Sequence, residues 1–285
     1  MSSSAATTSR QNLKKPCASF SNVDESSDPM SYLRYLDNAG ASDWIQIKKR
    51  ESFSALGVTA GSRILDVGCG TGDDVRTLAG IVGNNGLVVG LDSSKTMITA
   101  ANARLRGLKI SAKYILGDAH QLNLTDDIFD ICRCERVFQH LKHPQKALSE
   151  MFRVIRPGGR IVVTETDWET LVIGCGKNNF TSDAIGMIRR TIRNPGIGHH
   201  LPILFEEAGL SEISATADTL MLRDFYMAKQ LLALDKVMKF REISKTALEK
   251  FKRWLEFLEK CSKQDRFFCA LTGFHVVGRK LEQGV

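Results

Sequence analysis

The sequence predicts an α/β fold in which an open, mostly parallel sheet carries helices on both faces. Two observations indicate this class. Short apolar runs of strand length alternate with helical patterns between residues 62 and 166, an order typical of doubly wound sheets. The glycine-rich stretch GCGTG directly follows the first of these runs, where such sheets bind nucleotides. We therefore expect a ligand at the carboxyl ends of the strands.

The expected strands share a short apolar core bounded by glycine or polar residues. In chain order they cover residues 62–68, 86–92, 111–119, 128–135 and 159–166. The expected helices have apolar residues at helical spacing, and the last of them closes at RPGG. They cover residues 73–82, 94–107 and 144–155.

The composition limits the classes of protein to which this chain can belong. The 285 residues are 43% apolar and 25% charged, which is ordinary for a globular chain. No apolar run reaches the length of a membrane span. The seven cysteines, scattered from Cys17 to Cys269, do not form the pattern of a disulfide framework. We therefore expect a reduced, cytoplasmic setting.

The first 28 residues differ from the rest. Residues 1–23 contain eight Ser/Thr, three basic residues and no acidic residue. That composition favours a disordered tail, and an organellar targeting segment has the same character. We expect one domain over residues 29–285, with N-terminal helices at 29–58 and a helical insert at 224–262 forming a cap over the site.

The net charge of +7 is concentrated late in the chain. Residues 236–280 hold 12 Lys/Arg against 5 Asp/Glu. Leu248, Phe251 and Leu255 fall on one face of an amphipathic helix in this segment. A solvated helix face explains the excess, and so does a patch that meets an anionic substrate, a membrane surface or nucleic acid.

The loop after the first strand has the spacing Gly68-x-Gly70-x-Gly72, which differs from the GxGxxG of dinucleotide enzymes. Asp73 and Asp74 follow where the next helix begins. Carboxylates there would repel a diphosphate, which a helix N-terminus otherwise attracts. A positively charged ligand without phosphate fits better, and S-adenosylmethionine meets that description. A nicotinamide dehydrogenase is disfavoured by the same features.

Acidic residues stand at or near the ends of three successive expected strands. Asp66 precedes the glycine loop, Asp92 ends the second strand, and Asp118 follows the third. A carboxylate at the second position can accept hydrogen bonds from both ribose hydroxyls, and Asp118 can accept one from the adenine amino group. Each aspartate alone could instead cap a helix or turn. The three together favour an adenosyl ligand.

These residues belong to motifs that resemble those of class I S-adenosylmethionine-dependent methyltransferases, of the type that includes the ubiquinone and menaquinone C-methyltransferases. The matching stretches are ILDVGCGTG, GLD, GDA, FDICRCERVFQHL and ALSEMFRVIRPGGRIVV, over about residues 60–165. The resemblance implies a Rossmann-like, seven-stranded sheet whose last strand is antiparallel. It also implies S-adenosyl-L-methionine as the cofactor.

The resemblance implies a set of cofactor-binding residues. Gly68 and Gly70 would contact the methionine part, Asp92 the ribose, and Asp118 with Ala119 the adenine edge, while Met97 packs on the adenine and Gln46 reaches the carboxylate. The full expected set is Gln46, Asp66, Gly68, Cys69, Gly70, Asp92, Ser93, Met97, Asp118, Ala119 and Glu135.

The stretch after the fourth strand faces the cofactor and should decide the chemistry. His140 is the candidate catalytic base, because an unperturbed imidazole titrates near pH 6.5; a capping role is the alternative. The Asn/Asp-Pro-Pro-Tyr and Pro-Cys signatures of DNA methyltransferases are missing here, so nucleic acid is disfavoured. Cys132 and Cys134 are read as core residues, and no metal is expected.

Candidate acceptor-binding residues come from two regions. Tyr32 and Tyr35 lie in the N-terminal helical segment, and Asp167 with Trp168 follows the fifth strand. An aromatic ring beside a carboxylate suits a planar or cationic acceptor, whereas the late basic excess suits an anionic one. His199 and His200, in the turn NPGIGHHLP, are read as surface or lid residues.

We therefore predict an enzyme that transfers a methyl group from S-adenosylmethionine to carbon, oxygen or nitrogen of a small metabolite. The alternatives are a methyltransferase for RNA or protein, and a binding module without catalysis. The fold does not select the acceptor.

Overall fold

The computed structural model describes residues 20–40, 49, 52–53, 56–240 and 242–282. The strands are β1 (Arg63–Val67), β2 (Leu87–Asp92), β3 (Ala112–Leu116), β4 (Phe129–Glu135), β5 (Ile155–Gly174), β6 (Ser211–Leu222) and β7 (Phe268–Arg279). The helices are η1 (Phe20–Asn22), α1 (Met30–Gly40), α3 (Asp73–Val82), α4 (Lys95–Leu105), η2 (Phe138–His140), α5 (Pro144–Val154), α6 (Thr181–Arg190), α7 (Ile197–Glu207), α8 (Phe225–Leu231), α9 (Leu234–Val237) and α10 (Lys245–Ser262).

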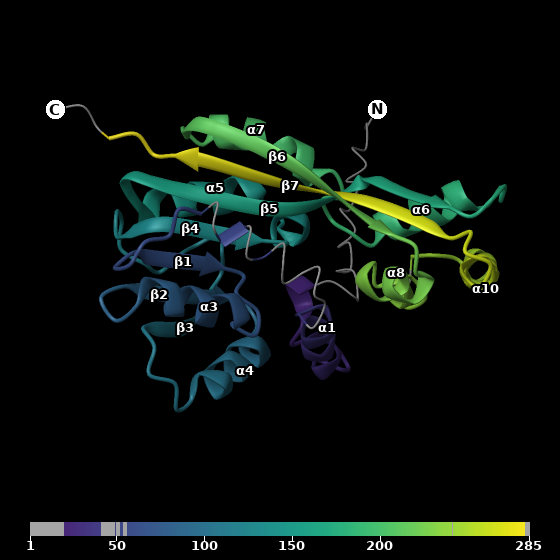
Figure 1. Ribbon diagram of the computed structural model, residues 1–285, viewed down its shortest axis with the longest axis horizontal. Coiled ribbons are helices and arrows are strands. Elements are labelled where there is room, and N and C mark those ends of the chain that lie inside the picture. The colour runs from purple at the N-terminus through teal and green to yellow at the C-terminus, as the bar shows by residue number, and fades with distance from the viewer. Residues whose placement is uncertain (1–19, 41–48, 50–51, 54–55, 241, 283–285) are drawn as a thin grey trace, which may run out of the picture.

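The seven strands form one sheet in the order β3-β2-β1-β4-β5-β7-β6 (Figure 1). Strands β1 to β5 pair in parallel, and β7 runs antiparallel to both β5 and β6. The predicted mostly parallel sheet with an antiparallel last strand is therefore confirmed. The strand order reverses between β1 and β4, and ligands bind beside such a reversal.

Helices cover both faces of the sheet because side chains alternate along each strand. In β1, Ile64 points into a core that contains Val75 and Leu78 of α3. Its neighbour Leu65 points the other way, into a core that contains residues of α5 and α7. Both faces of the central strands are thus buried, which is typical of parallel sheets.

A second hydrophobic core lies beyond the main sheet. Strand β5 extends eight residues past the expected end at residue 166, because β7 continues to pair with it as far as Gly174 opposite Phe268. Trp168 and Leu171 of this extension pack with residues of α6, α8 and α10. Figure 1 shows these helices gathered at the far end of β5, β6 and β7, away from α3 and α4.

Helix α10 lies within the late basic segment and buries one face. Phe251, Trp254 and Leu258 are almost fully buried, whereas Lys252 and Arg253 on the same helix are exposed. These charges of α10 therefore occupy a solvated face. No helix in the described part of the chain combines the length and apolar character that a membrane span requires.

A disulfide joins Cys175, just after β5, to Cys261 of α10, at a sequence separation of 86. The sequence predicted no disulfide framework and a reduced setting, and this one pair departs from that expectation. The spacing along the sequence gave no indication of it, because the two cysteines meet only through the packing of α10 against the β5 extension. Cys132 and Cys134 are buried in the main core as free thiols, as predicted.

Candidate functional site

A cavity of about 1360 Å³ opens at the carboxyl ends of β1, β2 and β4. Its wall extends from Phe20 of η1 to His275 of β7, so that segments from most of the chain contribute to it. It gathers most of the residues that the sequence predicted to bind cofactor or acceptor. These are Tyr35, Asp66, Gly68, Cys69, Gly70, Asp92, Ser93, Met97, Asp118, Ala119, Glu135, His140 and Trp168.

The glycine loop lines the cavity in a backbone conformation that residues with a side chain rarely adopt. Gly68 has φ +78° and Gly70 has φ +53°, both in the left-handed region. A Cβ atom on Gly68 would lie 2.2 Å from Cγ2 of Val137. The backbone of β1 therefore turns sharply past Val137, and its N–H groups are drawn toward β2, where Gly68 N donates to Leu91 O at 2.7 Å.

Asp92 fixes this loop from the end of β2. Its Oδ2 accepts from Gly70 N and its Oδ1 from Ser94 N, each at 2.9 Å. Burial raises the pKa of the Asp92 carboxyl, although these backbone hydrogen bonds act to lower it. Each carboxylate oxygen has a second lone pair, so Asp92 retains capacity to accept from a ligand in the cavity.

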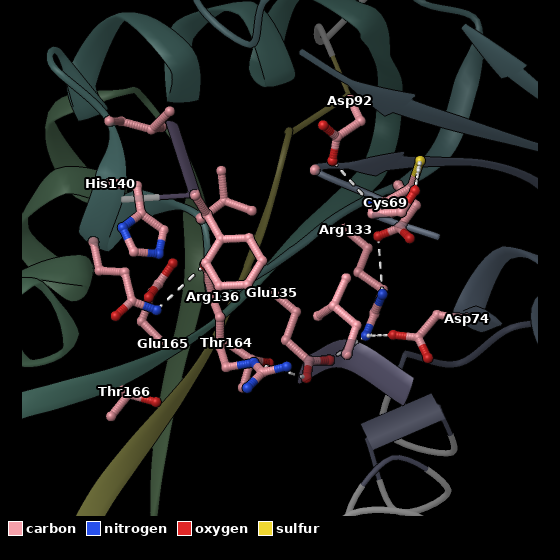
Figure 2. Close-up of a pocket in the computed structure, with 18 of the residues that line it drawn as sticks. Cys69, Asp74, Asp92, Arg133, Glu135, Arg136, His140, Thr164, Glu165 and Thr166 are labelled. Carbon is pink, nitrogen blue, oxygen red and sulfur yellow. Dashed lines mark hydrogen bonds and ion pairs between the residues drawn. The ribbon is translucent and has the colours of Figure 1, made fainter. Parts of the chain in front are cut away.

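Arg133, in the middle of β4, holds three acidic residues together. Its guanidinium donates to Asp66 at 2.9 Å, to Asp74 at 2.8 Å, and to Glu135 (Figure 2). Burial raises the pKa of Asp66 to about 6. For Asp74, burial is outweighed by Arg133 and Lys49, which lower the pKa to about 2. The network is buried but internally paired, as buried charges must be.

The acidity expected of the glycine loop is therefore largely compensated. Asp73 pairs with Arg76 and with Arg104 of α4, and Asp74 pairs with Lys49 and Arg133. The expected repulsion of a diphosphate by Asp73 and Asp74 is therefore weakened. Arg76 is a local partner, whereas Arg104, Lys49 and Arg133 come from parts of the chain that the local sequence does not indicate.

The end of the cavity beyond β2 is formed by Met97, Asp118 and Ala119. Asp118 accepts from the backbone N–H of His120 at 2.9 Å, and its Oδ1 lies 2.6 Å from Nδ1 of the same imidazole. These bonds outweigh burial and lower the Asp118 pKa. Met97 is buried at the start of α4 and packs with Tyr32 and Leu33. Gln46 lies outside the described residues.

His140 lines the cavity at the end of η2, with its ring centroid 5.8 Å from that of Phe20. Burial, with added repulsion from Lys236, Arg136 and Arg193, lowers its pKa to about 3. The imidazole is therefore neutral at neutral pH and is a weak proton acceptor. His140 stays a candidate catalytic residue, but its pKa lies below the ordinary value near 6.5, because of burial and of three cations that the sequence does not place beside it.

Two of the four expected acceptor residues line the cavity. Tyr35 donates through its hydroxyl to Leu231 O at 3.2 Å, and Trp168 donates through Nε1 to Oε1 of Gln139 at 2.7 Å. Both interactions orient a ring within the cavity wall. They also connect α1 to the end of α8, and the β5 extension to η2.

Tyr32 and Asp167 are placed differently from the expectation. Tyr32 is buried beside the cavity and packs edge-on against Phe20, with ring centroids 5.0 Å apart. The Asp167 carboxylate is fully buried and accepts from His199 N at 2.9 Å, next to Nδ1 of the same histidine. It therefore caps the first turn of α7, because alternation along β5 directs it toward that helix.

His199 and His200 were expected in a turn and lie instead in the first turns of α7. His200 Nδ1 lies 2.8 Å from Gly196 O, which fixes it to the helix start. Within the described residues no group of three His, Cys, Asp or Glu side chains is arranged to hold a metal ion. The absence of a metal in the working enzyme stays a prediction.

Glu165 is a functional candidate that sequence reasoning missed. It lies on β5 and lines the cavity with no exposed surface; one oxygen accepts from Phe138 N. Burial raises its pKa to about 8. Among the described residues, Ser52, Glu165 and His275 have a buried polar side-chain atom without a hydrogen-bond partner, and all three line this cavity. The signal in the sequence was a carboxylate inside the fifth expected strand, two residues after its apolar run Ile161–Val163.

The residues of the cavity fit an adenosyl cofactor. Asp92 presents a carboxylate beside a loop whose glycines have no side chain. Asp118, which follows the neighbouring strand β3, offers a second hydrogen-bond acceptor. Most buried polar atoms in proteins have a hydrogen-bond partner. Ser52 Oγ and Glu165 Oε2 have none among the described residues, which indicates that the cavity binds a polar ligand. The fold and this cavity define the class of doubly wound, nucleoside-binding enzymes.

Comparison with known proteins narrows the class. The family described as methyltransferase domain matches residues 58–209. A 37.1 kDa protein of transposon TN4556 from Streptomyces fradiae is 35% identical over 250 residues, which are 87% of this chain and 71% of that protein. The chain belongs to the methyltransferase domain family, and it is a class I, S-adenosylmethionine-dependent methyltransferase.

Other relatives match over less of their length. Demethylmenaquinone methyltransferase from Bacillus cereus is 34% identical over 125 residues, which are 44% of this chain and 53% of the relative. Among solved structures, this chain resembles phosphoethanolamine N-methyltransferase 2 of Haemonchus contortus in complex with S-adenosyl-L-methionine, with a TM-score of 0.61 at 17% identity. The matched region covers 93% of this chain and 60% of that protein chain. The [4+2]-cyclase SpnF has a TM-score of 0.51 at 22% identity, covering 85% and 84%. These two likenesses show the fold alone.

Proposed function

We propose that this methyltransferase acts on a small molecule bound between the cofactor-binding edge of the sheet and the helical cover formed by α1, α8 and α9. The observation that carries the proposal is the cavity itself. It is lined on one side by Asp92 and the glycine loop, and on the other by Tyr35, Trp168 and His140. The names of the relatives, which include methyltransferases of a quinone precursor and of a phosphorylated amine, support a metabolite as acceptor.

The cofactor half of the site comprises the glycine loop and the ends of β2 and β3. We assign Asp92 and Ser93 to the ribose, Asp118 and Ala119 to the adenine edge, and Gly68 to the methionine part, beside Asp66, Cys69, Gly70 and Glu135. When bound, S-adenosylmethionine supplies an electrophilic methyl group attached to a sulfonium sulfur. The role of Glu135 is electrostatic, since a carboxylate near a positive sulfur stabilises it.

The acceptor half contains His140, Tyr35 and Trp168. His140 is the candidate catalytic residue, and with a pKa near 3 it acts as a neutral imidazole that orients a donor group of the acceptor. Tyr35 and Trp168 supply flat apolar surface, held by their hydrogen bonds to Leu231 and Gln139. Positioning of the acceptor and exclusion of water are the main contributions that these side chains make.

Isothermal titration with S-adenosylmethionine and S-adenosylhomocysteine tests the cofactor assignment. Asp92→Asn should weaken binding about tenfold or more, because an amide replaces one charged acceptor oxygen. Asp183→Asn, an exposed site on α6, is the matched control and should bind as the wild type does. Equal affinity of Asp92→Asn and wild type would remove Asp92 from the cofactor site.

His140→Ala separates binding from turnover in the same experiment. It should lower the rate of S-adenosylhomocysteine formation with a metabolite acceptor and leave cofactor affinity nearly unchanged. A protein that binds the cofactor but forms no S-adenosylhomocysteine with metabolites, RNA or protein would instead be a binding module.

A further inference from the structure

The acceptor half of the cavity is lined by three cations from three distant parts of the chain. Arg136 follows β4, Arg193 lies between α6 and α7, and Lys236 is on α9. All three line the cavity together with His140, and all three act electrostatically on its imidazole. The basic excess that the sequence shows at residues 236–280 contributes only one of them, and the other two come from outside it.

Lys236 is held by aromatic rings. Its ammonium lies 4.5 Å from the ring centroid of Phe20, 4.7 Å from that of Tyr32 and 5.1 Å from that of Tyr35. Cation–π contacts of this kind fix the position of a cation but do not neutralise its charge. Burial and the neighbouring Lys239 and Arg136 lower its pKa to about 8, so the side chain is mostly charged at neutral pH.

The described carboxylates leave this charge largely uncompensated. Within the described residues, no Asp or Glu lies within ion-pair distance of Arg193 or Lys236, and Arg136 is 3.9 Å from Glu135, which Arg133 already engages. Glu165 lines the same cavity, but with a pKa near 8 it is mostly protonated at neutral pH. Asp218, on β6, interacts electrostatically with His275.

The balance of charge differs between the two parts of the cavity wall. Beside the glycine loop, Asp66 and Glu135 are paired with Arg133, and Asp92 accepts from backbone N–H groups. Arg136, Arg193 and Lys236 line the same cavity together with His140, and Asp218 of β6 lines it as well. Figure 2 shows Arg133 and Asp74 apart from His140. A set of cations in a site shielded from water attracts an anion more strongly than the same set in water. Flat apolar walls from Phe20, Tyr35 and Trp168 lie beside them.

Resting on the proposed function, we propose that the acceptor carries an anionic group, such as a carboxylate, phosphate or ionised phenol, on a flat apolar body, and that Arg136, Arg193 and Lys236 bind that group. This arrangement stabilises an acceptor already in its anionic form. An acceptor that is already ionised has no proton to lose at that group, so a histidine that is a weak proton acceptor is sufficient.

Binding of small aromatic anions tests this inference without the true acceptor. Protein saturated with S-adenosylhomocysteine is titrated with benzoate and phenyl phosphate, and with benzamide as the neutral counterpart. The anions should bind, and benzamide should bind at least about tenfold more weakly. Arg193→Gln and Lys236→Met should each weaken anion binding by about tenfold. Arg253→Gln, exposed on α10, should leave it unchanged.

The cofactor titration separates the two proposals. If the folded wild-type protein binds S-adenosylhomocysteine but neither anion, or if benzamide binds as tightly as benzoate, the anion site is overturned and the methyltransferase assignment stands. Equal weakening by Arg193→Gln and Arg253→Gln would mean general charge rather than a site, and also overturns it. Anion binding without any cofactor binding would support the anion site while removing Asp92 from its assigned role.

Discussion

The cost of ionising a buried side chain in this molecule depends on whether a neighbouring charge compensates it. Arg133 is buried with Asp66, Asp74 and Glu135, and their mutual attraction keeps all of them tolerable inside the sheet. Glu165 has no such cation at hydrogen-bonding distance among the described residues. Its raised pKa therefore makes ionisation costly in the folded state.

Glu165→Gln should change how stability depends on pH. The folded-state pKa near 8 lies above the usual 4.5, so the wild-type carboxyl ionises more readily when unfolded, and stability falls as pH rises from about 4.5 to about 8. Between pH 5 and 8 this loss is on the order of 3 kcal/mol. Urea denaturation at several pH values should show a shallower decline in the variant. Parallel wild-type and variant curves would mean that Glu165 titrates normally.

The structural elements divide between two cores that share β5 and β7. The first part of β5 and the last part of β7 pack with α5 and α7, whereas the last part of β5 and the first part of β7 pack with α6, α8 and α10. The disulfide between Cys175 and Cys261 ties the end of the β5 extension to α10. It closes a chain segment that includes α6, α7, β6 and most of the helical insert.

Reduction of this disulfide should lower thermal stability. A crosslink at a sequence separation of 86 restricts the unfolded chain and stabilises the fold by roughly 4.6 kcal/mol in the chain-entropy description. The melting temperature should therefore fall in the presence of a phosphine reductant. Cys261→Ser should melt at the lower temperature and respond to reductant no further. A wild-type protein that melts identically with and without reductant contradicts the crosslink.

At the scale of the whole molecule, one cavity joins parts that are far apart in sequence. Its walls include η1 and α1 near the start, the glycine loop, η2, the end of α8 with α9, and β7 near the end. The Tyr35 bond to Leu231 and the aromatic contacts of Lys236 connect the first helices directly to the insert. Occupation of the cavity should therefore stabilise both at once.

Cofactor binding should slow hydrogen exchange in α1 and in α8–α9 together. At a hundred times its dissociation constant, S-adenosylhomocysteine should raise the free energy of unfolding by about 2.7 kcal/mol. Mass spectrometry of exchange with and without this ligand measures both segments in one experiment. Protection confined to the glycine loop and the end of β2 would mean that the cover does not respond to the cofactor half.

The sequence predicted the elements whose signal is local. Strands β1 to β4 and helices α3 to α5 lie within a few residues of their expected bounds, because alternation of apolar runs and a glycine turn encode them directly. The extension of β5 was not predictable in this way, since its partner is β7, about a hundred residues later. Asp167 was misplaced because a polar residue after a strand does not reveal which face it will take.

The cofactor half of the site was largely predictable, and the acceptor half was not. Gly68 and Gly70 sit in one short motif, Asp92 ends the next strand along the chain, and strand order brings them to one edge. Arg136, Arg193 and Lys236 share no motif and no spacing. Their proximity depends on how the helical cover packs, so the lowered pKa of His140 could not be foreseen from the sequence.

The double use of β5 and β7 has a consequence for how such a protein can diversify. The parts assigned to the cofactor stand on the parallel strands, whereas α6, α8 and α10 stand on the outer lengths of the antiparallel ones. Leu231 of α8, Lys236 of α9 and Thr191–Arg193 after α6 line the cavity. Changes in these segments thus alter one wall of the cavity and leave the wall formed by the glycine loop intact. Related enzymes can in this way come to act on different methyl acceptors while they retain the same methyl donor.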